Sequence, residues 1–258
     1  MAVDRWVSRD KQCTILFQDA YDFPGSMPAD LPESTFDAII TDPPYGIPAK
    51  AGFVRKGGTV ISNGVGTFNS SENPYRWIPL YAPLVKQGGH MAFFIDLFTG
   101  EAALEAVRFA GLSFWHKYYI VKAAPPPTPR PTFASSVEEC IIAESKNGNR
   151  HWFGGGYTPN RWIGCTPNML GVGLGHESEK PLEAIMELVK ALTPVGGSVL
   201  DPFVGSGTTV TACMAIGRKC VAIENDRRYF EMAVERAKSG DFSTDQSTVT
   251  GIFGGQKE

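Results

Sequence analysis

Two hydrophobic patterns alternate along the chain. Short apolar runs between turn residues are typical of buried strands, and they occur at 14–19, 36–40, 90–95, 139–144, 198–201 and 220–224. Some of these runs are followed by apolar residues at helical spacing. The clearest apolar stripe of this kind consists of Leu182, Ile185, Met186, Val189 and Leu192. Strands that alternate with helices predict an α/β fold.

Weaker patterns extend this series of elements. Residues 101–108 predict a helix that Gly111 ends, and the aromatic and β-branched residues 114–122 predict a strand. Residues 77–86 predict partly helical structure that the glycine pair at 88–89 would end. The last predicted helix carries these residues: Tyr229, Met232, Ala233, Arg236 and Ala237.

The length of the chain limits the number of domains, and its charge bears on which partners it can bind. The chain has 258 residues, enough for one sizeable α/β domain with a small insertion. Its formal net charge is −3, whereas a dedicated nucleic-acid binder is usually basic. Local charge matters more than the sum, and two stretches are basic: Lys50, Arg55 and Lys56, and then Lys146, Arg150, His151 and Arg161.

The five cysteines include no Cys-x-x-Cys pair, which favours free thiols in a reducing compartment over disulfides or a zinc site. No apolar run reaches the length of a membrane helix, and the N-terminus lacks a basic-then-apolar signal pattern. We therefore expect a cytoplasmic protein.

The segment whose residues are best suited to catalysis or ligand binding follows the apolar run 36–40. It reads Asp42-Pro43-Pro44-Tyr45. Neither proline can donate to a strand ladder, so the strand stops and presents an aspartate and an aromatic ring at its carboxyl end. Ligands of open α/β sheets bind at that edge. The alternative is a turn with an Asp cap and a packed tyrosine.

A second stretch, 198–209, reads as a strand, a glycine-rich turn and a helix start. Gly205 and Gly207 lack Cβ atoms, so backbone N–H groups at the helix N-terminus can approach a ligand closely. Val210 stands where a dinucleotide site would need its third glycine, which disfavours a nicotinamide cofactor. Glu224 follows the turn by roughly the twenty residues expected of a ribose-binding acid.

Together these stretches resemble the amino-group DNA methyltransferases, which use S-adenosylmethionine (SAM). Residues 42–45 match their catalytic motif and residues 201–209 their cofactor motif, in the family's permuted β order. The resemblance covers most of the chain, about 14–237. It implies a Rossmann-like SAM-dependent methyltransferase fold: a seven-stranded, mostly parallel sheet with helices on both faces and one antiparallel edge hairpin. That hairpin would pair 114–122 with 139–144.

The resemblance also implies roles for individual residues. The implied catalytic residues are Asp42, Pro43, Pro44 and Tyr45. The implied cofactor-binding residues are Asp19, Ala20, Asp42, Ser178, Lys180, Pro181, Asp201, Pro202, Phe203, Gly205, Ser206, Gly207, Thr208, Thr209, Glu224 and Asn225. SAM is the implied methyl donor, and no metal is expected. Two departures from the family are Gln18-Asp19 in place of Gly-Asp and Glu177-Ser178 in place of Pro-Thr.

These residue types suit methyl transfer to an amine. The Asp42 carboxylate and the Pro43 carbonyl can each accept one N–H, which aims the nitrogen lone pair at the SAM methyl group. Asp42 then stabilises the developing positive charge, and Tyr45 can stack on the target. A base inside a duplex cannot reach the methyl donor, so it must be flipped out.

The predicted organisation is one catalytic domain over 1–240 and a flexible tail over 241–258. Residues 46–76 would form a mobile loop over the target base, because so long a loop is uncommon unless it is functional or disordered. Residues 147–176, rich in glycine, aromatic residues and arginine, would form a small target-recognition insertion. The alternative for residues 46–76 is a plain surface insertion. The alternative for residues 147–176 is a structural insertion held in place by its aromatic side chains.

The sequence thus predicts a site-specific DNA methyltransferase that acts on adenine N6, because in this family an aspartate at position 42 favours adenine and a serine favours cytosine N4. Cytosine-N4 methylation is the alternative, and a non-catalytic SAM- or DNA-binding relative is disfavoured. The expected partner is double-stranded DNA, with a homodimer left open and no membrane. Any restriction endonuclease would be a separate chain, and the expected setting is bacterial or phage cytoplasm.

Overall fold

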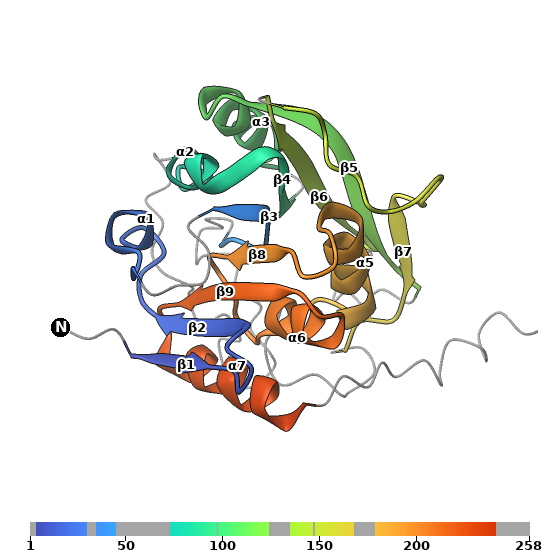
Figure 1. Cartoon of the computed structure of the whole chain (residues 1–258). Helices are drawn as coiled ribbons and strands as arrows, with labels where there is room; N and C mark the ends of the chain where they lie inside the picture. The colour runs from blue at the N-terminus through green and yellow to red at the C-terminus, as the bar shows by residue number, and fades with distance from the viewer. Residues whose placement is uncertain are drawn as a thin grey trace, which may run out of the picture.

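The computed structural model describes residues 4–29, 35–44, 73–96, 98–123, 135–146, 148–167 and 179–240. Within them the chain forms one nine-stranded sheet in the order β1-β2-β9-β8-β3-β4-β6-β5-β7 (Figure 1). The strands are β1 (Arg5–Val7), β2 (Cys13–Phe17), β3 (Phe36–Thr41), β4 (Val85–Ile95), β5 (Leu112–Lys122), β6 (Val137–Ser145), β7 (Arg161–Gly164), β8 (Ser198–Asp201) and β9 (Lys219–Glu224).

The centre of the sheet is parallel: β2, β9, β8, β3 and β4 all run in one direction. β6 runs antiparallel between β4 and β5, and β1 is antiparallel to β2. The mostly parallel α/β sheet that the sequence predicts is confirmed, but within the described residues it has nine strands instead of seven. The two additional strands are β1 and β7, and β7 pairs with β5, so the antiparallel β5–β6 pair does not form the edge.

Helices cover both faces of the sheet, as predicted (Figure 1). They are α1 (Phe23–Ser26), α2 (Ile78–Tyr81), the 3₁₀ helix η2 (Ala82–Leu84), α3 (Gly100–Phe109), α5 (Leu182–Leu192), α6 (Thr208–Ala215) and α7 (Arg227–Ser239). Because side chains alternate along a strand, Ile40 packs with α5, α6 and α7. Its neighbour Ile39 packs on the opposite face with α1, α2 and α3.

The glycine pair at 88–89 lies inside a strand and does not end a helix. β4 begins at Val85 and continues through both glycines, directly after η2. Gly88 has φ +72°, and a Cβ atom there would lie 2.0 Å from the carbonyl oxygen of Asn149. The glycines therefore allow an irregular strand to pass close to another segment, which a helix-ending signal does not distinguish.

None of the described helices is both long and apolar enough to cross a membrane. All five cysteines are free thiols, and four of them are buried.

Candidate active site

Four acidic residues follow or end four neighbouring parallel strands. In sheet order, Asp19 follows β2, Glu224 ends β9, Asp201 ends β8 and Asp42 follows β3. Parallel strands place their carboxyl ends at one edge of the sheet. The topology thus brings the two sequence motifs, which are far apart in the chain, to adjacent strands.

A direct hydrogen bond joins the two motifs. The Thr41 hydroxyl donates to Oδ1 of Asp201 at 2.6 Å, and the Phe203 backbone N–H donates to the same oxygen at 3.1 Å. Burial raises the pKa of Asp201 to about 6, while hydrogen bonds from Thr209 and Thr41 oppose that rise. Asp201 therefore ties the start of the glycine turn to the end of β3.

The glycine turn has the backbone form that its sequence predicts. Gly205 has φ +52° and Gly207 has φ +87°, both in the left-handed region that favours glycine. Gly207 is the N-cap of α6, and no side chain among the described residues caps that helix. The first backbone N–H groups of α6 therefore suit an anionic ligand group.

Glu224 holds the other side of this turn. Its carboxylate accepts backbone N–H groups of Gly205 at 2.9 Å, Asn225 at 3.0 Å and Asp226 at 2.9 Å. Burial raises the pKa of Glu224, and these hydrogen bonds counteract the rise. One strand further along, Oδ1 of Asp19 accepts the N–H of Tyr21 at 2.8 Å. The carboxylates of Glu224 and Asp19 thus lie at the edge of the sheet where the resemblance implies cofactor-binding residues.

Two more predicted residues flank the turn. The Ala20 carbonyl accepts the Tyr81 hydroxyl at 2.6 Å, and the Phe203 ring packs edge-on against Trp77 with ring centroids 5.6 Å apart. The residues present therefore fit SAM: two carboxylates for hydroxyl and amine groups, a helix N-terminus for a carboxylate, and an apolar wall. Tyr45 and Ser178 lie outside the described residues.

Sequence reasoning missed a chain of alternating charges beside Asp42, in which Lys180 is buried and the other side chains are partly buried. The Lys180 ammonium forms ion pairs with Asp42 and with Glu138, the second at 3.2 Å. Glu138 also pairs with Lys122 at 2.8 Å. Glu138 and Lys122 lie on β6 and β5, so only the pairing of those strands beside Lys180 could have revealed them. Pro181, next in sequence, is the N-cap of α5.

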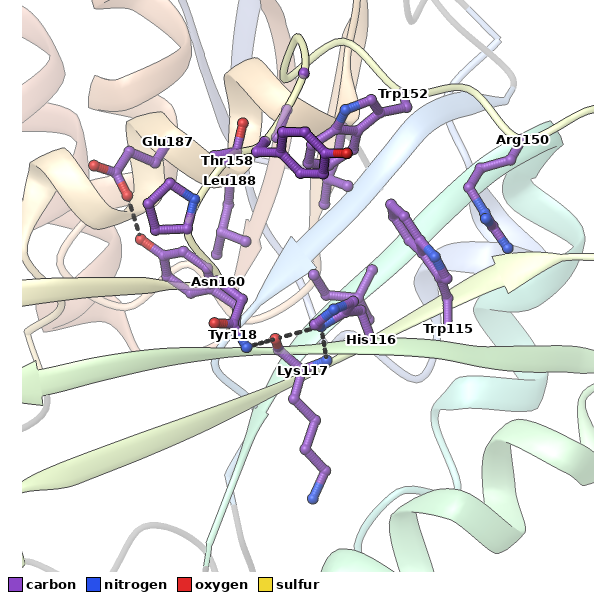
Figure 2. Close-up of a pocket in the computed structure, with 16 residues that line it drawn as sticks. Trp115, His116, Lys117, Tyr118, Arg150, Trp152, Thr158, Asn160, Glu187 and Leu188 are labelled. Carbon is purple, nitrogen blue, oxygen red and sulfur yellow. Dashed lines mark hydrogen bonds between the residues drawn. The ribbon is translucent and has the colours of Figure 1, made fainter.

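A separate hollow of about 420 Å³ lies between β5, α5 and residues 150–160. Figure 2 shows Tyr118 and Glu187 at one end, where the tyrosine hydroxyl donates to the carboxylate at 2.6 Å. Arg150 lies beside Trp115 at the other end, with its guanidinium 4.5 Å from the ring centroid. Arg150 also pairs with Glu144 through two nitrogens. The described part of residues 147–176 therefore packs against the sheet through Arg150 and through Trp152, whose ring lies edge-on to Trp115 with centroids 5.5 Å apart.

No group of three or more histidine, cysteine, aspartate or glutamate side chains in the described part of the chain could hold a metal ion.

Comparison with known proteins decides the family. Residues 36–235 match the family described as DNA methylase, of the N6/N4 methyltransferase type. The chain belongs to this DNA methylase family. The matched range contains both the Asp42 motif and the glycine turn, so the resemblance to amino-group DNA methyltransferases is confirmed.

Relatives of this DNA methylase include two bacterial proteins. The type II methyltransferase M2.LlaDCHI of Lactococcus lactis subsp. cremoris is 27% identical over 228 residues, which cover 81% of this chain and 84% of the relative. The type II methyltransferase M2.DpnII of Streptococcus pneumoniae is 26% identical over 227 residues, with the same coverage of both chains.

Solved structures share the fold of this DNA methylase. The M1.HpyAVI–SAM complex superposes with a TM-score of 0.68 at 24% identity, and the match covers 87% of this chain and 98% of that one. The PvuII DNA methyltransferase, described as cytosine-N4-specific, gives a TM-score of 0.65 at 14% identity, with 89% and 86% covered. These likenesses confirm the Rossmann-like α/β architecture.

Proposed function

We propose that this DNA methylase transfers a methyl group from SAM to the N6 amino group of adenine at a specific DNA site. The observation that carries the proposal is the placement of Asp42 directly after β3, next to the glycine turn that follows β8. A methyl donor held by that turn and an amine held by Asp42 would then meet at one edge of the sheet.

SAM would supply an activated methyl group. Glu224 and Asp19 would bind its hydroxyl and amine groups, and the N-terminus of α6 would bind its carboxylate. One of the solved structures of this fold, M1.HpyAVI, is a complex with SAM, which supports the same cofactor here.

Asp42 and Pro43 would then act on the target amine. Asp42 accepts one N–H and the Pro43 carbonyl the other, so that the nitrogen lone pair points at the methyl group. The carboxylate also stabilises the positive charge that forms on nitrogen during attack. The transfer would be a direct displacement: the N–C bond forms as the S–C bond of SAM breaks, SAM leaves as a neutral thioether, and the methylated amine releases one N–H proton. Alignment would therefore supply much of the rate. Tyr45 is proposed to stack on the flipped base.

Cytosine N4 is the second candidate target. Its amine is also exocyclic, and the PvuII enzyme of the same fold is described as cytosine-N4-specific. The aspartate at position 42 favours adenine, since serine at this position is typical of the cytosine enzymes.

Double-stranded DNA is the proposed partner, and the bacterial relatives favour action on DNA in a bacterial cytoplasm. Residues 147–176 are proposed to recognise the site; within them, Phe153 and Tyr157 are exposed. The loop predicted over 46–76 lies outside the described residues up to position 72, and so does the tail over 241–258. Their roles as base-covering loop and flexible tail stay predictions.

Expression in a methylation-deficient bacterium, followed by sequencing that detects modified bases, tests this function. We expect N6-methyladenine at one recurring sequence and none in cells with the Asp42→Ala variant. N4-methylcytosine would establish the second candidate instead. Absence of any modified base, from a protein that is expressed and binds SAM, would contradict the proposal.

A further inference from the structure

We infer that Lys180 is a positioning residue that holds the Asp42 carboxylate in the orientation needed for methyl transfer, with Glu138 as the counter-charge of Lys180. The inference rests on the proposed function, because it assigns Asp42 the role of amine acceptor. It differs from the role that the resemblance implies for Lys180, which is contact with the cofactor.

The geometry places the Lys180 ammonium between two carboxylates. It contacts Oδ2 of Asp42 on one side and lies 3.2 Å from Oε2 of Glu138 on the other. The side chain of Lys180 is only 8% exposed, and its ammonium lies 4.9 Å from the ring centroid of Phe94. A cation enclosed in this way has little freedom to move, so it fixes the carboxylate that it contacts.

Fixing one oxygen of Asp42 fixes the plane of the whole carboxylate. An ammonium bound at Oδ2 gives Oδ1 a defined direction. Oδ1 needs that direction in order to accept an N–H of the amine and align the amine for direct displacement. Lys180 directly precedes Pro181 at the N-cap of α5, so a rigid helix supports the ammonium.

The charges explain why Glu138 is required. A cation beside Asp42 opposes the positive charge that develops on the amine. Glu138 offsets that cation, and Lys122 in turn pairs with Glu138 at 2.8 Å. The four groups alternate in sign and sum to zero, so Asp42 is oriented without losing its electrostatic effect on the amine.

Lys180 is not suited to accept a proton from the methylated amine. Burial alone would lower the pKa of Lys180, but the charges of Asp42 and Glu138 outweigh burial and raise that pKa. The side chain is therefore an ammonium at neutral pH. Its remaining role at Asp42 is to donate a hydrogen bond.

The test compares the wild-type protein with Lys180→Met, Lys180→Arg and a matched control, Lys86→Met. Lys86 lies on β4 and pairs with Asp37 at 3.1 Å, so the control removes another lysine–aspartate pair, at the end of β3 opposite to Asp42. Single-turnover methyl transfer to DNA is measured at saturating SAM, and the Kd of SAM is measured by calorimetry. We expect Lys180→Met to slow transfer by about 100-fold, the size of effect that misplacement by an ångström produces.

The Kd of SAM should stay within about threefold in all variants, since contact with SAM is not the role inferred for Lys180. Lys180→Arg should recover at least tenfold of the lost rate, and Lys86→Met should transfer at the wild-type rate. A folded Lys180→Met protein with full transfer rate, or one that loses SAM affinity but keeps its rate at saturating SAM, overturns the inference. If Lys180→Met does not fold, Lys180→Gln serves in the same comparison.

A double-mutant cycle with Asp42→Asn separates action through Asp42 from a general structural effect. The double variant should be no slower than Asp42→Asn alone, whereas independent roles would multiply the two losses. A wild-type protein that transfers no methyl group would contradict the proposed function. In that case the unfolding temperatures of the wild type, Lys180→Met, Asp42→Asn and the double variant test the contact between Lys180 and Asp42. Losses in unfolding temperature that simply add would overturn the inference.

Discussion

Gly207 and Ala233 lie so close that a Cβ atom on the glycine would be 3.0 Å from Cα of Ala233. Gly207 ends the glycine turn, and Ala233 lies on α7. The turn is therefore constrained twice, by its φ of +87° and by the helix packed behind it. Any side chain at position 207 must move either α7 or the N-terminus of α6.

The variant Gly207→Ala should consequently lose SAM binding by at least tenfold and unfold at a lower temperature. Left-handed backbone alone costs an alanine roughly 1–2 kcal/mol, and the contact with Ala233 adds to that. Gly217→Ala is the matched control, because Gly217 has φ +67° but open space around its missing Cβ. Calorimetry with SAM and thermal unfolding of both variants measure the difference. Equal behaviour of the two would show that the close contact has no effect.

The order of elements could be predicted because each central strand is an apolar run that ends at a polar residue. β1 and β7 were missed because they have only three and four residues and, unlike the equally short β8, neither leads into a glycine turn that marks its end. The glycine turn was predicted because its conformation depends on local residue types. The Lys180–Glu138 pair was not, because it depends on how β6 lies beside the start of α5.

His90 gives the fold a predicted sensitivity to acid. Its ring is fully buried next to Trp115, and neither ring nitrogen has a hydrogen-bond partner among the described residues. Burial lowers the pKa of His90 from 6.5 to about 4. The unfolded chain therefore binds a proton between these pH values that the folded protein does not, and this group costs stability as pH falls from 6.5 to 4.

The variant His90→Phe should remove that cost. Relative to wild type, its free energy of unfolding should rise by about 3 kcal/mol between pH 6.5 and pH 4, since one pKa unit corresponds to about 1.4 kcal/mol. Well above pH 6.5, where the histidine of the unfolded chain is also neutral, the difference should be constant. Urea unfolding across this range measures it, with His116→Phe, an exposed position on β5, as the control. A pH-independent difference for His90→Phe would contradict the assignment.

Two arginines of the proposed recognition segment should behave differently. Arg150 is held by Glu144 and covers Trp115, whereas Arg161 is exposed at the start of β7. Arg161→Ala should weaken binding to all DNA sequences alike and lower the salt slope by about one, as expected for a phosphate contact. Arg150→Ala should instead lower the unfolding temperature. DNA binding over a salt series distinguishes them; an unchanged slope for Arg161→Ala would remove that arginine from the DNA interface.

The central claim is that Asp42 acts chiefly on the amine of a DNA base, during methyl transfer. Tritiated methyl transfer from SAM to DNA, with identification of the labelled nucleoside and calorimetry of SAM binding, tests it on wild type and Asp42→Ala. We predict N6-methyladenine from wild type, no transfer from Asp42→Ala, and SAM affinities within about tenfold of each other, because Asp42 acts chiefly during transfer. Near-normal turnover by Asp42→Ala would contradict the claim.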